Sequence, residues 1–183
     1  FLPTLTEYDR YLFGQGTHYK IYEKLGAHPM EINGVKGVAF AVWAPNAQSV
    51  SVIGSFNNWN ILRHPMRVLA ESGIWELFIP KVCPGDTYKF HILGADGSAV
   101  DKADPYAFFS EVRPQTASVV TARAYRWGDK KWMDQRKKAN PYRSPMNIYE
   151  VHLGSWMQVQ QEDGAPRSMT YLEIAEHLIP YMQ

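Results

Sequence analysis

The stretch TYKFHIL at residues 87–93 decides the fold class, because polar and apolar residues alternate along it. Successive side chains of a β-strand point to opposite sides, so this alternation predicts a strand with one buried face. The predicted inward side chains are Tyr88, Phe90 and Ile92. Lys89 and His91 fall on the other side. The pair Asp96-Gly97 that follows is a strong hairpin signal, so a second strand is expected to return beside the first.

Further short apolar runs lie on both sides of this stretch, separated by clusters of Gly, Pro and Asn. These runs lie at residues 38–43, 50–54, 74–79 and 117–121. Asn33-Gly34 marks another hairpin. Because five or more short strands occur with no helical pattern between them, the sequence predicts an antiparallel β-sandwich over residues 31–124. Trp43 and Trp75 lie in these strands, where we expect them to belong to the core.

The pattern changes in the last third of the chain. Residues 125–144 form a polar connector, whose basic run we interpret as a solvated linker because acidic residues interrupt it. An apolar run at residues 146–153 predicts a strand. Thr170 and Glu173 have the spacing of a capping box and predict the start of a helix. Four apolar residues then repeat at helical spacing, namely Leu172, Ala175, Leu178 and Ile179. Strand, loop and helix make half of a βαβ unit, so we expect a piece of a larger α/β protein.

Composition excludes several classes of protein. The 183 residues include 19 Lys and Arg against 18 Asp and Glu, which argues against a broad basic face for nucleic acid. No apolar run approaches the roughly 20 residues that span a bilayer, so we predict no membrane partner. Cys83 is the only cysteine, which excludes a disulfide framework or a thiolate zinc cluster and suits a reducing compartment such as the cytoplasm. The six His show no metal-ligand spacing, and we predict neither a metal nor a cofactor.

Several stretches resemble the bacterial glycogen branching enzymes, which are 1,4-α-glucan branching enzymes of the α-amylase superfamily. The stretches are GTH at 16–18, YEKLGAH at 22–28, FAVWAPNA at 40–47, FNNW at 56–59, HPM at 64–66, SGIWELFIP at 72–80, DPYA at 104–107, RPQTAS at 113–118 and IYEVHLGSW at 148–156. The resemblance is collinear and covers nearly the whole chain. It implies that residues 31–124 are a family-48 carbohydrate-binding module with an immunoglobulin-like sandwich. Residues 1–30 would lead in from a preceding N-terminal segment, and residues 145–183 would begin the catalytic (β/α)₈ barrel.

The resemblance also implies an activity for the longer protein. The family cuts an α-1,4-glucan, holds a covalent glycosyl-enzyme and passes the segment to a 6-hydroxyl, which makes the α-1,6 branches of glycogen. Its catalytic carboxylates lie on later barrel strands, so no catalytic residue is assigned in this chain and the fragment alone is predicted to be inactive. The implied partners are an α-1,4-glucan, such as glycogen or a maltooligosaccharide, and the remainder of the barrel.

A candidate carbohydrate site lies in the loop GSFNNWN at residues 54–60. Flat rings bind sugars by stacking on their C–H faces, while amide and ammonium groups bind the hydroxyls. Glycan-binding relatives use residues that match Trp59 and Lys89, and Asn58 is the neighbouring amide. Trp59 could equally be a packing anchor, and the two readings have similar weight. Because Ser98 stands where binding relatives carry a second Trp after the Asp-Gly turn, we expect weak binding.

Two other readings of the whole chain remain open. One is a free-standing glycan-binding or regulatory module, against which the strand expected at residues 146–153 speaks. The other is a debranching or trehalose-forming relative with the same two modules. The stretches at residues 22–28 and 154–156 are more similar to the branching group.

Overall fold

The computed structural model describes residues 3–122, 125–162 and 164–183. The chain divides into two compact units, Phe1–Tyr125 and Arg126–Gln183, and each is considered by itself. The first unit holds the two larger sheets, and the described part of the second holds three α-helices and one small β-hairpin.

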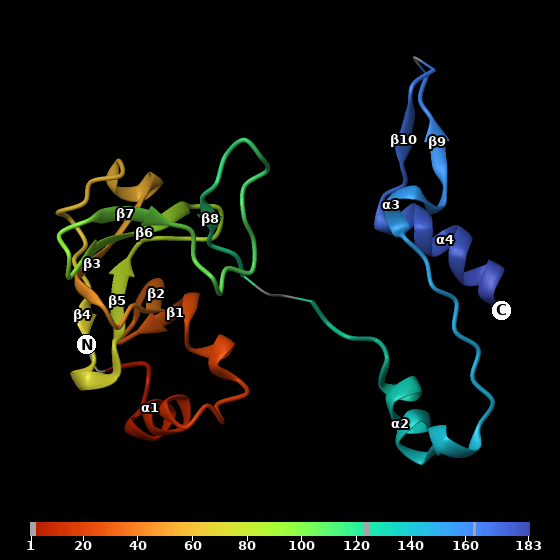
Figure 1. Cartoon of the computed structure of the whole chain (residues 1–183), viewed down its shortest axis with the longest axis horizontal. Helices are drawn as coiled ribbons and strands as arrows, with labels where there is room; N and C mark the ends of the chain where they lie inside the picture. The colour runs from red at the N-terminus through yellow and green to blue at the C-terminus, as the bar shows by residue number, and fades with distance from the viewer. Residues whose placement is uncertain (1–2, 123–124, 163) are drawn as a thin grey trace. The chain divides into compact units, whose positions relative to one another are not determined.

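Two antiparallel sheets make up the first unit (Figure 1). The first sheet has the order β1-β2-β5-β4. Its strands are Gly26–Ile32 (β1), Val35–Trp43 (β2), Ile74–Pro80 (β5) and Arg67–Val68 (β4). In the second sheet, β6 pairs with β3 on one side and with both β7 and β8 on the other. Its strands are Ala47–Gly54 (β3), Thr87–Gly94 (β6), Ala99–Lys102 (β7) and Ser118–Val119 (β8).

Both predicted hairpins are present. Asn33 and Gly34 join β1 to β2 with positive φ values of 50° and 79°, the conformation that a tight two-residue turn requires. The second turn contains Gly97, which also has a positive φ, and returns the chain from β6 to β7. The strand β1 begins at Gly26, within residues 1–30, for which no strand was expected. It pairs with β2 along its whole length, from Gly26 to Ile32.

The main core lies between the two sheets, and the predicted alternation is confirmed on the strands that face each other. Its members include Val38, Phe40 and Val42 of β2, Val50 and Val52 of β3, Trp75 and Ile79 of β5, and Tyr88 and Phe90 of β6. Tyr88 is fully buried, and its hydroxyl donates to Asp104 Oδ2 at 2.6 Å. Burial and the neighbouring Asp104 raise the pKa of Tyr88, so the phenol stays neutral and holds this buried carboxyl.

The expectation that Trp43 belongs to the main core is wrong. It is 53% exposed and lies outside the main core, because Val42 and not Trp43 has the parity that points inward on β2. Its ring instead makes an edge-to-face contact with Phe13 of the N-terminal segment, with centroids 5.7 Å apart. Trp75 is buried in the core as expected.

The N-terminal segment packs on the outer face of the first sheet. It contains helix α1 (Glu7–Gly14), which begins at Thr6 with a capping box, and a 3₁₀ turn at Ile21–Glu23. A second core forms where this segment meets the sheet, and its members are Leu5, Leu25, Ala41, Leu69 and Ile74. Residues 3–25 therefore belong to the packing of the first unit, although they precede its first strand.

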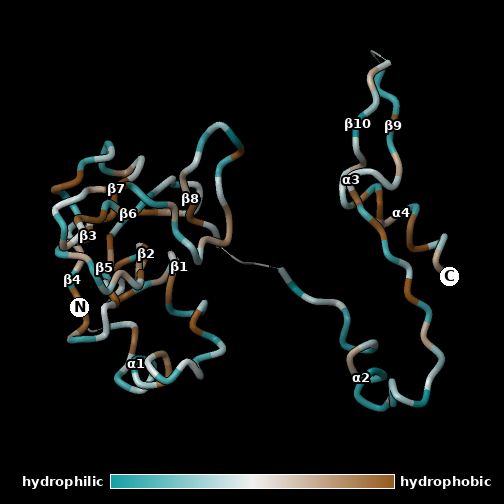
Figure 2. The backbone as a smooth tube through the Cα atoms, in the orientation of Figure 1, coloured by the Kyte–Doolittle hydropathy of each residue, from teal (hydrophilic) through white to brown (hydrophobic). Residues whose placement is uncertain are grey.

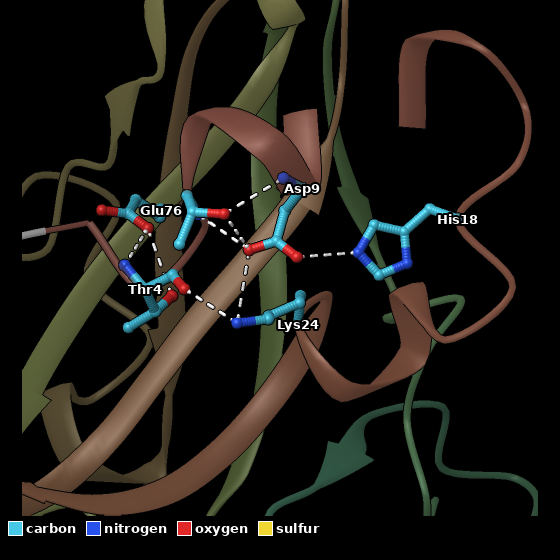
Figure 3. Close-up of polar contacts among 6 residues, drawn as sticks. Thr4, Asp9, His18, Lys24 and Glu76 are labelled. Atoms are coloured by element: carbon cyan, nitrogen blue, oxygen red, sulfur yellow. Dashed lines mark hydrogen bonds and ion pairs between the residues drawn. The ribbon is translucent and has the colours of Figure 1, made fainter. Parts of the chain in front are cut away.

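Polar contacts reinforce that docking (Figure 3). Glu76 of β5 is 1% exposed, and its carboxylate accepts hydrogen bonds from Thr4 N at 3.1 Å and from Arg67 Nη2 at 2.6 Å. A buried charge is tolerated only when it is paired and hydrogen-bonded, which both contacts provide. Asp9 of α1 lies 2.9 Å from His18 Nε2 and 3.4 Å from Lys24 Nζ.

The second unit differs from expectation in two places. The connector contains a helix that the sequence reading did not assign, α2 (Lys130–Lys138), which is mostly hydrophilic (Figure 2), followed by a 3₁₀ turn at Pro141–Arg143. The predicted strand at residues 146–153 is wrong, since residues 144–152 have neither helix nor strand and helix α3 (Leu153–Trp156) begins at its end. A strand needs a neighbour for its backbone groups, and no described strand pairs with this run.

The predicted C-terminal helix is present as α4 (Tyr171–Met182), after the hairpin of β9 (Gln158–Gln160) and β10 (Pro166–Ser168). Its capping box is confirmed, because the Glu173 carboxylate accepts from Thr170 N at 2.7 Å and Thr170 Oγ1 accepts from Glu173 N. The predicted apolar stripe is only partly covered. Ile174 is the buried residue of this helix, whereas Leu172 is 80% exposed.

Candidate functional site

The loop that carries Trp59 is held to the end of β3 by one buried amide. Asn57 ends the 3₁₀ turn Ser55–Asn57 and is 2% exposed. Its Oδ1 accepts from Gly54 N at 2.9 Å, and its Nδ2 donates to Val52 O at 2.9 Å and to His64 Nδ1 at 2.8 Å. A buried amide whose hydrogen-bonding groups all have partners restrains the backbone segments that it binds. The loop is therefore positioned by its own sequence and by His64.

Asn58 and Trp59 follow with φ values of 54° and 57°, both in the left-handed region. Asn tolerates this region, but for a bulky residue it is an outlier that costs about 1–2 kcal/mol. The backbone N–H of Trp59 donates to Gly54 O at 3.0 Å, which closes the loop. The result is a Trp side chain that is 42% exposed beside an exposed Asn58. Part of this residue is therefore exposed to solvent.

Lys89 comes from β6 and lies on the outward side of the second sheet, opposite in parity to Tyr88 and Phe90. It pairs in register with Ile53 of β3, one residue before the Gly54 that anchors the Trp59 loop. The structure therefore brings the three predicted residues to the same end of β3. Lys89 is half-buried, and its Nζ donates to Thr116 Oγ1 at 2.8 Å.

Two further polar contacts on this face were missed from the sequence. Thr116 lies in the segment before β8 and orients the Lys89 ammonium. Its neighbours in the stretch RPQTAS do not predict this contact. His91 is next on the same side of β6, and its Nδ1 lies 2.7 Å from Asp101 Oδ1 of β7. The alternation of residues 87–93 already placed His91 beside Lys89, but its partner becomes visible only with the strand register.

The hairpin turn at the far end of this sheet carries no ring. Ser98 donates its hydroxyl to Asp96 Oδ1 at 2.6 Å, and Ser98 and Ala99 are exposed. These hydrogen bonds lower the pKa of Asp96. A single aromatic side chain thus serves this candidate site within the residues quoted above, which limits the area that a sugar could cover.

Two other kinds of site, a metal centre and a membrane span, can be judged from the residues that the structure describes. There, His, Cys, Asp and Glu side chains do not group in threes or more where a metal ion could be held. Over the same residues, every helix falls short of the length and apolar content needed to cross a membrane.

Comparison with known proteins identifies the first unit. The family description "Carbohydrate-binding module 48 (Isoamylase N-terminal domain)" matches residues 24–107. Among solved structures, ligand-free PulA from Klebsiella pneumoniae aligns with 53% of this chain and 9% of its own, at 25% identity and a TM-score of 0.43.

Curated relatives match nearly the whole chain, and they are named 1,4-alpha-glucan branching enzyme GlgB. The relative from Synechococcus sp. (strain JA-3-3Ab) is 50% identical over 97% of this chain. Those from Rhodospirillum rubrum and Rubrobacter xylanophilus are 52% and 53% identical over 100% of it. The chain spans about a quarter of the length of these relatives, from 24% to 25%. The chain is therefore similar, over nearly its whole length, to part of the 1,4-α-glucan branching enzymes, and residues 24–107 match a carbohydrate-binding module 48.

Proposed function

We propose that the protein to which this chain belongs is a 1,4-α-glucan branching enzyme, and that this part of it binds α-1,4-glucan. The observation that carries the proposal is the identity of about half the residues to enzymes of that name over nearly the whole chain. The reaction would transfer an α-1,4-linked segment to a 6-hydroxyl of glycogen through a covalent glycosyl-enzyme.

The catalytic step itself belongs outside this chain. A retaining glycosyl transfer needs two carboxyl groups about 5 Å apart across the scissile bond, supplied in this family by later barrel strands. Residues 145–183, the proposed start of the barrel, are far fewer than the roughly 250 that a complete barrel needs. The isolated chain is therefore inactive in this proposal. An iodine-stain or linkage assay that detects branching by the pure 183-residue chain would contradict it.

The glucan contact is assigned to Trp59, Lys89 and Asn58. The exposed part of the Trp59 ring stacks on the C–H face of a glucose unit, and the Asn58 amide and Lys89 ammonium bind its hydroxyls. Lys89 is held at this end of β3 by Thr116, so its ammonium is positioned before sugar arrives. A preorganised group loses less freedom on binding than a mobile one.

The remainder of the barrel is the second proposed partner. Ile148, Leu172 and Ile179 are exposed in the second unit, although apolar side chains of a folded protein are usually covered. In the longer protein, we expect the remainder of the barrel to cover these side chains. A cytoplasmic location stays a prediction that rests on the single cysteine.

Titration of maltoheptaose into the 183-residue chain tests the binding proposal. Backbone amide shifts should change around residues 54–60 and at Lys89. Shifts confined to other regions, or none at high sugar concentration, would contradict the assignment.

A further inference from the structure

A cavity of ≈ 400 Å³ lies at one end of the sandwich and is lined by Phe56 of the Trp59 loop and by residues outside that loop. Its volume falls in the range of small-molecule pockets. Its apolar lining comes from Phe56, Ile79, Pro80 and Val82. The Phe56 ring is half-buried, and it packs against the His64 ring with centroids 5.7 Å apart. Ile79 and Val82 are buried, so the half-buried Phe56 and the exposed Pro80 provide most of the apolar surface open to an occupant.

The polar lining of this cavity consists of Arg63, His64 and Lys81, and no carboxylate lines it. Neither Arg63 nor Lys81 forms an ion pair with another described residue, so both cations lack a counter-charge within that part of the chain. The backbone of Lys81 has a φ of 65°, and its N–H donates to Lys36 O at 3.0 Å, which fixes the point from which its exposed side chain extends. Two unpaired cations beside one cavity favour an anion there.

The hydrogen bonds around His64 determine which ring nitrogen carries its proton. Gly54 N–H donates to Asn57 Oδ1, so the other end of this amide is the NH₂ group. That group donates to His64 Nδ1, which must therefore be the unprotonated acceptor. The proton of a neutral imidazole is then on Nε2, and the ring offers one more N–H donor. Burial and the nearby Arg63 lower the pKa of His64, which favours this neutral form.

We propose that this cavity binds a sugar phosphate. Arg63, Lys81 and the His64 Nε2–H hold the phosphate, and the sugar ring lies on Phe56 and the aliphatic lining. A bare phosphate would leave the apolar lining unused, whereas an unmodified sugar would leave two cations without a partner. The phosphate could belong to a free hexose phosphate or to a phosphorylated glucose unit of a glucan. This site shares the loop at residues 54–60 with the proposed Trp59 site, but it uses none of the three residues assigned to the glucan contact.

The test uses the 183-residue chain and follows backbone amide shifts at constant ionic strength. The ligands are glucose 6-phosphate, glucose, inorganic phosphate, and maltoheptaose with and without a phosphate group. The sugar phosphates should bind at least about tenfold more tightly than their unphosphorylated counterparts, because a single hydrogen bond between charged groups is enough for a factor of ten. A double variant, Arg63→Gln with Lys81→Gln, should lose that advantage.

The matched control removes two exposed cations outside the cavity, Lys20→Gln with Lys131→Gln, and should bind as the wild type does. Trp59→Ala serves as the background for the maltoheptaose pair, so that stacking at the other site does not mask the effect. If phosphorylation raises the affinity for maltoheptaose but not for glucose, the phosphate comes from a glucan. The proposal is overturned if the control variant loses as much affinity for the sugar phosphates as the double variant does, or if the double variant binds them as tightly as the wild type. It is also overturned if inorganic phosphate binds as tightly as both sugar phosphates.

Discussion

Trp59 has the most unusual conformation of the candidate site, since a Trp with a φ of 57° is strained. Replacing it by Ala should leave that strain unchanged, because Ala also disfavours this region. Trp59→Ala should therefore keep the melting temperature near the wild-type value. It should weaken maltoheptaose binding by about 1–3 kcal/mol, the range found for base–aromatic stacking.

The measurement is an NMR titration with maltoheptaose, for which the lone ring leads us to expect a wild-type dissociation constant of roughly submillimolar to millimolar. Trp132→Ala is the control, because Trp132 is similarly exposed but belongs to the second unit. Equal binding by folded Trp59→Ala and wild type would make Trp59 a packing anchor.

Asn57 is expected to matter more for stability than either of its exposed neighbours. Asn57→Ala removes the partner of the Gly54 N–H and of Val52 O, both buried, and should lower the free energy of unfolding by about 2–3 kcal/mol. Urea unfolding measures this difference. Asn58→Gly is the control, because glycine adopts the positive φ of Asn58 without strain. If the two variants unfold at the same urea concentration, the amide does not hold the loop.

Residue by residue, the sequence predicts which side chains of a strand face inward but not which amide of a loop is buried. Alternation places Tyr88 and Phe90 correctly, because a strand repeats every two residues whatever surrounds it. Among the Asn residues of residues 54–60, the buried one also binds His64, which lies on another segment. Thr116 was missed for the same reason, since only the folded chain brings it to Lys89.

Among the elements, those with local signals were predicted and those that need a partner were not. Asn33-Gly34 and the capping box at Thr170 act within a few residues, and the structure contains both. The strand β1 was missed because Pro29 and its neighbours hide the alternation, and pairing with β2 forms it regardless. The opposite error occurred at residues 146–153, where an apolar run has no strand to pair with.

That missing partner gives a prediction for hydrogen exchange. Amides from Tyr149 to Leu153 should exchange much faster than those of Val50 to Gly54, since the latter are paired with β6 and the former lie outside any sheet. Mass spectrometry or NMR of the monomeric chain measures both rates. Sedimentation controls for dimers, which could protect the segment by pairing it with another copy. Equal protection in a monomer would contradict the structure of this segment.

At the scale of the whole first unit, the N-terminal segment adds a second core and a set of charged contacts to the sandwich. Leu5 and Leu25 cover Ile74 on the outer face, and Thr4 binds the buried Glu76 close by. The sequence reading placed residues 1–30 outside the sandwich, because nothing local shows that an irregular segment packs on a sheet. The stability of the sandwich should therefore respond to contacts made entirely within that segment.

Asp9 provides the test through its pH dependence. Burial alone would raise its pKa, but hydrogen bonds from His18 and Thr6 and the Lys24 charge hold the pKa well below the usual range of an aspartate. A carboxyl whose pKa is depressed on folding stabilises the protein above its unfolded pKa, and this stabilisation is lost as the pH falls toward the folded value. Asp9→Asn should thus unfold at lower urea than wild type near pH 7, and the difference should shrink at about pH 3 and below. Asp134→Asn, exposed in the second unit, should leave unfolding of the first unit unchanged at both pH values. A difference between Asp9→Asn and wild type that grows as the pH falls would show that the Asp9 charge does not stabilise the docked segment.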